Sequence, residues 1–175
     1  MTEEKDIILR AEHITKIYGS NRAAAREMIK KGCSKEELFK QTGVTVAVDN
    51  ISFEVERGKI YVLIGLSGSG KSTVVRCLNR LNEVTSGTVL FEGKDISKFD
   101  KKELLEFRRK HISMVFQSFG LMSHRDVLGN VAYGLEVRGL GKEERERKAK
   151  EMISMVGLDG WEHESISSLS GGMRQ

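Results

Sequence analysis

The chain of 175 residues contains no proline and only two cysteines, Cys33 and Cys77. Two cysteines are too few for a disulfide framework, so the sequence favours a reducing compartment. The missing proline excludes no class of function, although average usage of about 5% would place several in a chain of this length. These two absences therefore bear on the compartment rather than on the chemistry.

Long apolar segments are also missing. The longest runs from Ile60 to Leu66, well short of the roughly 20 residues that cross a bilayer. The first residues, MTEEKD, are charged and unlike a signal peptide. The net charge of +4 is mild and no basic cluster is interleaved with aromatics, so we expect a solvated surface and no nucleic-acid partner. Hydrophobic residues at 39% and charged residues at 31% fit a single globular domain.

The spacing of apolar residues predicts an antiparallel opening, a buried strand–loop–helix core and a helical end. Apolar and polar residues alternate over 44–55, which predicts two half-buried strands joined at Asp49–Asn50. Ser34 and Glu37 form a capping-box pattern. Two continuously apolar segments, 60–65 and 112–117, predict strands buried on both faces. The other expected elements are strands over 7–18 and 88–93 and helices over 22–31, 35–42, 71–81, 101–110, 127–137 and 143–156.

The stretch GLSGSGKST, from Gly65 to Thr73, follows an apolar segment and opens an expected helix. That is the context of a phosphate-binding loop, in which bare glycine amides and a helix N-terminus surround a phosphate chain. Lys71 is expected to reach the β- and γ-phosphates and Ser72 to ligate Mg²⁺. The other expected nucleotide-binding positions here are Gly65, Ser67, Gly68, Ser69, Gly70 and Thr73.

The alternative is a glycine- and serine-rich turn with a chance lysine, which the flanking pattern disfavours. The loop alone does not choose among kinases, GTPases, helicases and transport ATPases. No guanine-reading Asn-Lys-x-Asp stretch is present, which disfavours a GTPase.

The last seven residues, LSGGMRQ, offer the hydroxyl of Ser170 and the bare amides of Gly171 and Gly172 at a helix start. Together with the phosphate loop about a hundred residues upstream, this stretch resembles the signature of ATP-binding-cassette (ABC) ATPases. The resemblance implies that these groups bind the γ-phosphate of ATP on a second copy, in a head-to-tail homodimer. The alternative is a capped turn with nothing bound.

Two further residues match positions of that family. Gln117, at the end of ISMVFQ, resembles the Q-loop glutamine, which implies contact with Mg²⁺ and the attacking water. Tyr18, in ITKIYG, resembles the aromatic residue that stacks on adenine, although the stretch 21–43 intervenes before the strands resume. The alternatives are a surface glutamine and a tyrosine packed under the sheet.

The resemblance implies an α/β fold, a P-loop NTPase with a RecA-like core, an antiparallel β subdomain and a helical subdomain, incomplete at the C-terminus. Residues 1–175 then form a partial ABC domain. Its parts are a β region over 1–64 with a helical insertion at 21–43, a P-loop core over 60–117, and a helical subdomain with the signature over 118–175.

Several segments, among them the insertion and RRKHISMVFQSFGLMSHRDVLGNVAYGLEVRG, are similar to the ATPase subunit of importers for glycine betaine and related quaternary amines. This implies ATP and Mg²⁺ as cofactors, transmembrane permease subunits as partners, a substrate-binding protein as an indirect partner, and a place at the cytoplasmic face of the membrane. An ABC ATPase for another substrate, or a non-transport ABC protein, stays open as an alternative.

Family members also carry, after the signature, an apolar strand ending in Asp-Glu (Walker B) and a histidine that senses the γ-phosphate. Neither occurs here, since His111, His124 and His163 precede the expected place of that histidine. We therefore expect the 175-residue piece to be inactive alone. Relatives also tend to have proline where this chain has Val84, Ser123 and Ile166, a loss of up to about 1 kcal/mol of stability per site.

Overall fold

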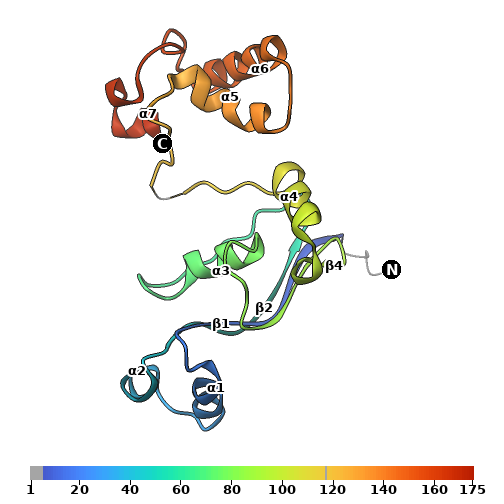
Figure 1. Ribbon diagram of the computed structural model, residues 1–175, viewed down its shortest axis with the longest axis vertical. Coiled ribbons are helices and arrows are strands. Elements are labelled where there is room, and N and C mark those ends of the chain that lie inside the picture. Colours follow the sequence, from blue (N-terminus) through green and yellow to red (C-terminus); the bar gives the residue numbers. More distant parts are fainter. Residues whose placement is uncertain (1–5, 117) are drawn as a thin grey trace. The chain divides into compact units, whose positions relative to one another are not determined.

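The computed structural model describes residues 6–116 and 118–175. The chain divides into two compact units, the first ending at Leu105 and the second beginning at Glu106. Figure 1 shows a sheet with helices in the first unit and a group of helices in the second. An antiparallel sheet and a helical part are two features of the fold class expected from the sequence.

Four strands form one sheet in the first unit. They are β1 (Ile7–Tyr18), β2 (Thr45–Glu56), β3 (Ser86–Phe91) and β4 (Lys94–Asp95), in the order β2-β1-β3-β4. Each neighbouring pair is antiparallel. β1 is therefore a central strand, and its side chains Ala11, Ile14 and Ile17 are almost completely buried.

The predicted joint at Asp49–Asn50 is wrong, because β2 runs through it as one strand. The alternation does break there, since Asn50 has a φ of +47° and His13 on β1 has a φ of +49°. The Asn50 amide N–H donates to Thr15 Oγ1 at 3.0 Å, and its side-chain oxygen lies 2.9 Å from His13 Nδ1. These contacts satisfy the irregular backbone of a β-bulge, so β2 bends without ending.

Two short helices, α1 (Arg22–Lys30) and α2 (Lys35–Thr42), lie between β1 and β2. The capping box is confirmed: the Glu37 amide donates to Ser34 Oγ at 3.2 Å, and the Ser34 amide donates to Glu37 Oε2 at 3.0 Å. α2 ends at Gly43, which has a φ of +67°. The helices bury a cluster against the ends of both strands, consisting of Ile17, Ala25, Leu38, Val44 and Val46.

Helix α3 (Lys71–Leu78) is shorter than the helix expected over 71–81. The segments 60–65 and 112–116 are also not strands, which contradicts the prediction of two buried strands. Ile60 and Ile64 are 93% and 91% exposed, and Val115 is 82% exposed. A strand buried on both faces needs hydrogen-bonded neighbours, and no described strand pairs with either segment.

The second unit is helical. Its main helices are α5 (Val127–Val137) and α6 (Lys142–Met155), followed by a 3₁₀ turn (Ile166–Ser168) and α7 (Gly171–Arg174). Two elements precede these helices in the chain. They are a 3₁₀ turn of the first unit (Ile96–Lys98) and α4 (Lys101–Lys110), which crosses the boundary between the units. The core of the second unit consists of Val127, Leu128, Ala132, Ala149, Ile153, Ile166 and Leu169.

The charged groups of this unit also join its parts. Arg125 forms two hydrogen bonds to the Glu136 carboxylate, at 2.8 and 3.2 Å.

None of the helices in the described part of the chain has the length and apolar character that spanning a bilayer requires.

Asp126 connects α5 to the segment that leads to α7. One carboxylate oxygen accepts the Gly129 amide at 2.7 Å as the helix cap, and the other lies 3.2 Å from His163 Nδ1. Partial burial raises the pKa of the Asp126 carboxyl, but the Gly129 amide and His163 outweigh it and leave this pKa below its usual range. The charged form of Asp126 is thus favoured in the folded unit.

We predict that Leu38→Ala lowers the free energy of unfolding by about 2–5 kcal/mol, because it removes a fully buried side chain from the cluster between the helices and strands. The exposed fraction of Leu38 is 1%. Urea denaturation followed by circular dichroism measures the change. The adjacent Phe39, 58% exposed, provides the control, and Phe39→Ala is expected to change stability by less than about 0.5 kcal/mol. Equal effects of the two substitutions would contradict the packing described here.

We predict that Asp126→Asn destabilises the protein by about 0.5–1 kcal/mol at pH 7, because asparagine still caps the helix but carries no charge. A lowered folded-state pKa contributes stability above the ordinary aspartate pKa of about 3.9, and that contribution is lost as the pH falls through the folded-state pKa. Denaturation at pH 7 and in steps below pH 4 should therefore show the gap between wild type and variant closing in acid. A gap that stays constant with pH would show that the charge has no role.

Candidate functional site: a glycine-rich loop and helix start

The predicted phosphate-binding stretch, residues 65–73, consists of a loop, 65–70, and the first three residues of α3. The helix begins at Lys71 because Gly70, its N-cap, has a φ of +93° and turns the chain. The Val74 amide donates to the Gly70 carbonyl at 2.9 Å as the first bond of the helix, and the Ser69 amide donates to the Leu66 carbonyl at 3.2 Å. The free amides of this first turn are the groups that favour an anion.

Two glycines of the loop lie close to other atoms, but only Gly70 lies close to backbone. A Cβ on Gly70 would lie 2.1 Å from the carbonyl oxygen of Ala47 on β2. A Cβ on Gly65 would lie 2.7 Å from Ser69 Oγ. Gly68 differs, because its φ is +78° but an added Cβ would meet nothing within 4 Å. The loop therefore favours glycine at Gly68 for conformation and needs it at Gly70 for both conformation and space.

The Lys71 ammonium group turns back over the loop. Its Nζ donates to the carbonyl oxygens of Gly65 at 2.8 Å and Leu66 at 2.7 Å, and lies 3.4 Å from Ser69 Oγ. The positive charge and the amides at the start of α3 thus belong to one compact loop. This combination of donors suits a polyanion such as the triphosphate of a nucleotide.

The hydroxyl groups that follow could take part in metal binding. Ser72 is exposed and Thr73 is half-buried, both in the first turn of α3. Among the described residues, no group of three or more His, Cys, Asp and Glu side chains could hold a metal ion. Mg²⁺ usually keeps several waters and binds through few protein ligands plus substrate phosphates, so the Ser72 hydroxyl beside a triphosphate fits this ion.

Tyr18, the last residue of β1, is 39% exposed. Its hydroxyl accepts a hydrogen bond from Asn82 Nδ2 at 2.7 Å, and Lys16 Nζ lies 4.9 Å from its ring centroid. The tyrosine is therefore neither buried under the sheet nor loose on the surface. Sequence reasoning missed Lys16 and Asn82. The available signal for Lys16 was its position two residues before Tyr18, because alternate residues of a strand share a face.

The remaining predicted site residues lie outside this loop. Ser170, in the second unit, caps α7, and its hydroxyl accepts the Met173 amide at 3.3 Å. Gly171 and Gly172 are exposed, and a Cβ on either would meet nothing within 4 Å. Gln117 lies outside the described residues, so the structure does not place it.

The fold is that of the P-loop NTPases. More particularly, the chain belongs to the ABC transporter family, whose model matches residues 48–175. This match includes the glycine-rich loop and the residues around Ser170. The resemblance that these motifs indicated is confirmed.

The chain is 52% identical to the glycine betaine/carnitine transport ATP-binding protein GbuA of Listeria monocytogenes, over 95% of this chain and 42% of the relative. It is 49% identical to the glycine betaine transport ATP-binding protein OpuAA of Bacillus subtilis, over 99% of this chain and 41% of the relative. It thus spans about two fifths of the length of these relatives. A solved dimeric structure of the ATP-binding cassette MJ0796, in a post-hydrolysis state bound to ADP and Pi, is also similar. It has a TM-score of 0.76 and 26% identity, covering 95% of this chain and 65% of that one.

We predict that Gly70→Ala destabilises the protein more than Gly68→Ala. Both glycines have a positive φ, which costs a residue with a Cβ about 1–2 kcal/mol, but only at Gly70 does the new methyl group collide with backbone, the Ala47 carbonyl. Chemical denaturation of the two variants measures the difference, and Gly68→Ala serves as the matched control for the conformational cost. Equal losses would contradict the close approach of α3 to β2.

Proposed function

We propose that this chain is the ATP-binding part of an ABC transport ATPase that energises the import of glycine betaine or a related quaternary-amine osmolyte. The single observation that carries the choice of substrate class is the 52% identity to GbuA over 95% of the chain. The loop geometry supports the ATP-binding part of the proposal, since the Lys71 ammonium and the glycine amides lie together. The division into 1–64, 60–117 and 118–175 remains part of this proposal.

In this proposal the amides of Gly65, Ser67, Gly68, Ser69 and Gly70 surround the phosphates and the Lys71 ammonium binds the β- and γ-phosphates. The Ser72 hydroxyl ligates Mg²⁺ and Thr73 binds at the α-phosphate. When bound, Mg²⁺ would supply positive charge that neutralises the phosphates. Gln117 contacts that metal and the water, and Tyr18 stacks on adenine.

The signature residues Ser170, Gly171 and Gly172 act, in this proposal, on ATP held by a second copy. Their supporting feature is local: the Ser170 hydroxyl accepts the Met173 amide and still has its own proton to donate, next to two amides with no side chain in the way. A head-to-tail homodimer follows, as does docking on permease subunits through residues 118–137 at the cytoplasmic face of the membrane. A substrate-binding protein delivers the osmolyte to the permease.

We predict that Lys71→Ala lowers Mg-ATP hydrolysis by about 10²-fold or more in the protein assembled with its permease subunits, because a charge that stabilises the transferring phosphate is lost. Phosphate release in proteoliposomes measures the rate. Lys94→Ala, which removes an exposed lysine of β4 in the same unit, is the matched control and should retain the wild-type rate.

The same vesicles test the substrate class. ATP-driven, Lys71-dependent uptake of radiolabelled glycine betaine supports the proposal. ATP hydrolysis coupled only to another solute would replace the substrate, and nucleic acid copurifying in place of permease subunits would favour a non-transport ABC protein. A protein that binds no Mg-ATP in calorimetry would overturn the proposed function altogether.

A further inference from the structure

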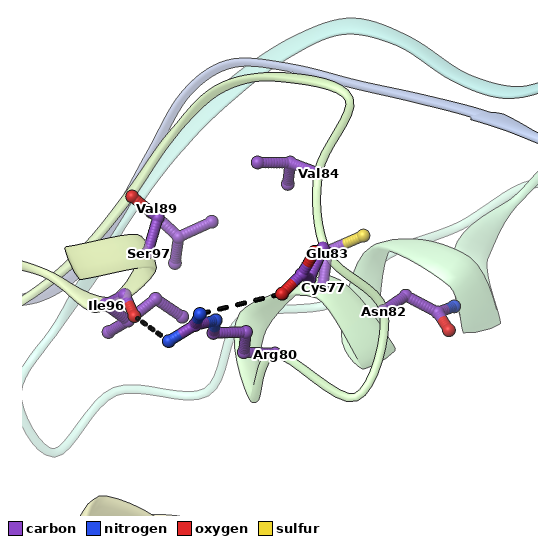
Figure 2. A pocket seen from close by; sticks show the side chains of 8 residues that line it. All are labelled: Cys77, Arg80, Asn82, Glu83, Val84, Val89, Ile96 and Ser97. Atoms are coloured by element: carbon purple, nitrogen blue, oxygen red, sulfur yellow. Dashed lines mark hydrogen bonds and ion pairs between the residues drawn. The ribbon is translucent and has the colours of Figure 1, made fainter. Parts of the chain in front are cut away.

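The segment that follows α3, residues 79–84, is held firmly against the sheet region. The Arg80 guanidinium donates to the carbonyl oxygens of Ile96 at 3.1 Å and Phe99 at 2.7 Å, and pairs with the Glu83 carboxylate at 3.5 Å. Arg80 itself has a left-handed backbone, with a φ of +54°. Figure 2 shows the contacts of Arg80 with Ile96 and Glu83 beside a pocket of about 170 Å³, with the Asn82 side chain directed away from the Arg80–Glu83 pair.

Asn82 and Glu83 each form a contact with the end of β1. The Asn82 side-chain amide donates to the Tyr18 hydroxyl at 2.7 Å. The Glu83 backbone carbonyl accepts a hydrogen bond from Lys16 Nζ, also at 2.7 Å. Lys16 is only 8% exposed, and the same ammonium lies 4.9 Å from the centroid of the Tyr18 ring. The segment 79–84 therefore fixes both the Tyr18 hydroxyl and the Lys16 ammonium group that lies over one face of the Tyr18 ring.

We propose that Asn82 and Lys16 are positioning residues that hold the Tyr18 ring ready to stack on the base of a bound nucleotide. This inference rests on the adenine-stacking role of Tyr18 proposed above. The Lys16 ammonium covers one face of the ring by a cation–π contact. The hydrogen bond from Asn82 holds the hydroxyl end of the side chain in place and so limits the swing of the ring about χ1. The base would stack on the opposite face of this ring, whose residue is 39% exposed.

The physical advantage is preorganisation. A tyrosine free to rotate loses side-chain entropy when a base stacks on it, and prior fixation removes that cost from binding. Asn82 also follows the helix that begins at the phosphate loop, and its backbone amide donates to the Arg76 carbonyl of that helix at 2.9 Å. The proposed base-binding ring is thus fixed by the segment that directly follows the helix on which Lys71 lies.

The test compares Mg-ATP with inorganic tripolyphosphate, which carries the phosphate chain without a base. Calorimetry on the complete protein uses wild type, Tyr18→Ala, Tyr18→Phe, Asn82→Leu and the double variant Tyr18→Phe/Asn82→Leu. We expect Asn82→Leu and Tyr18→Phe each to weaken ATP binding about three- to tenfold, with tripolyphosphate binding unchanged. Because both remove the same hydrogen bond, the double variant should be no weaker than either single one.

Lys16 has its own pair of variants. Lys16→Met removes the ammonium and is expected to weaken ATP selectively, while Lys16→Arg keeps a cation over the ring and should restore part of the affinity. Asn82→Asp should rescue Asn82→Leu, because the tyrosine hydroxyl can donate to the new carboxylate. If Asn82→Leu does not fold, Tyr18→Phe, which removes the same hydrogen bond, carries the test. Tyr61→Phe, which removes a phenol hydroxyl in the first unit and keeps the ring that stacks on Phe53, is the control and should bind ATP normally.

The outcomes separate the two proposals. If Tyr18→Ala weakens ATP selectively but the Asn82 and Lys16 variants weaken neither ligand, or weaken both equally, the positioning role is overturned and the stacking role stands. If Tyr18→Ala affects both ligands equally or neither, the stacking role fails and the positioning role fails with it. If wild type binds tripolyphosphate but gains no affinity from the base, both are likewise overturned.

Discussion

The glycine-rich loop is held to the sheet by a close approach between two backbones, that of Gly70 to the carbonyl of Ala47 on β2. No side chain fits between them, because a Cβ on Gly70 would lie 2.1 Å from that oxygen. The same glycine supplies the positive φ that turns the chain into α3. The position of the phosphate loop on the antiparallel sheet and the direction of the helix it starts therefore have one common cause.

The opposite end of α3 is fixed to the same sheet by polar contacts. Arg80 reaches two backbone carbonyls beyond β4, Glu83 accepts from Lys16, and Asn82 donates to Tyr18. α3 is thus held to the sheet at both ends, by steric fit at its start and by hydrogen bonds just after its end. A rigid link of this kind would let the proposed phosphate site and the proposed base site keep a constant relation although they come from distant parts of the sequence.

Local patterns were the part of the structure that could be predicted from the sequence. The capping box of Ser34 and Glu37, the start of α3 after Gly70 and the bounds of α5 all depend on residues within one or two turns of each other. The predicted joint between two strands at Asp49–Asn50 was wrong because a turn and a bulge both accept a residue with positive φ. Only the pairing with the partner strand decides between them. The link from Asn82 to Tyr18 joins positions far apart in the chain, and no periodic pattern encodes such a pair.

The two apolar segments, 60–65 and 112–116, show why some predictions depend on more than the segment itself. Their composition predicts burial on both faces, yet Ile64 is 91% exposed. An apolar strand lowers its free energy only when neighbouring strands satisfy its backbone and other layers cover its side chains. The glycine-rich loop between Ile64 and α3 has no such requirement, because its bonds are made among residues 65–74 and its one essential neighbour is β2. The residues proposed to bind the phosphates are therefore arranged by short-range interactions, even where the adjacent segment is not part of a sheet.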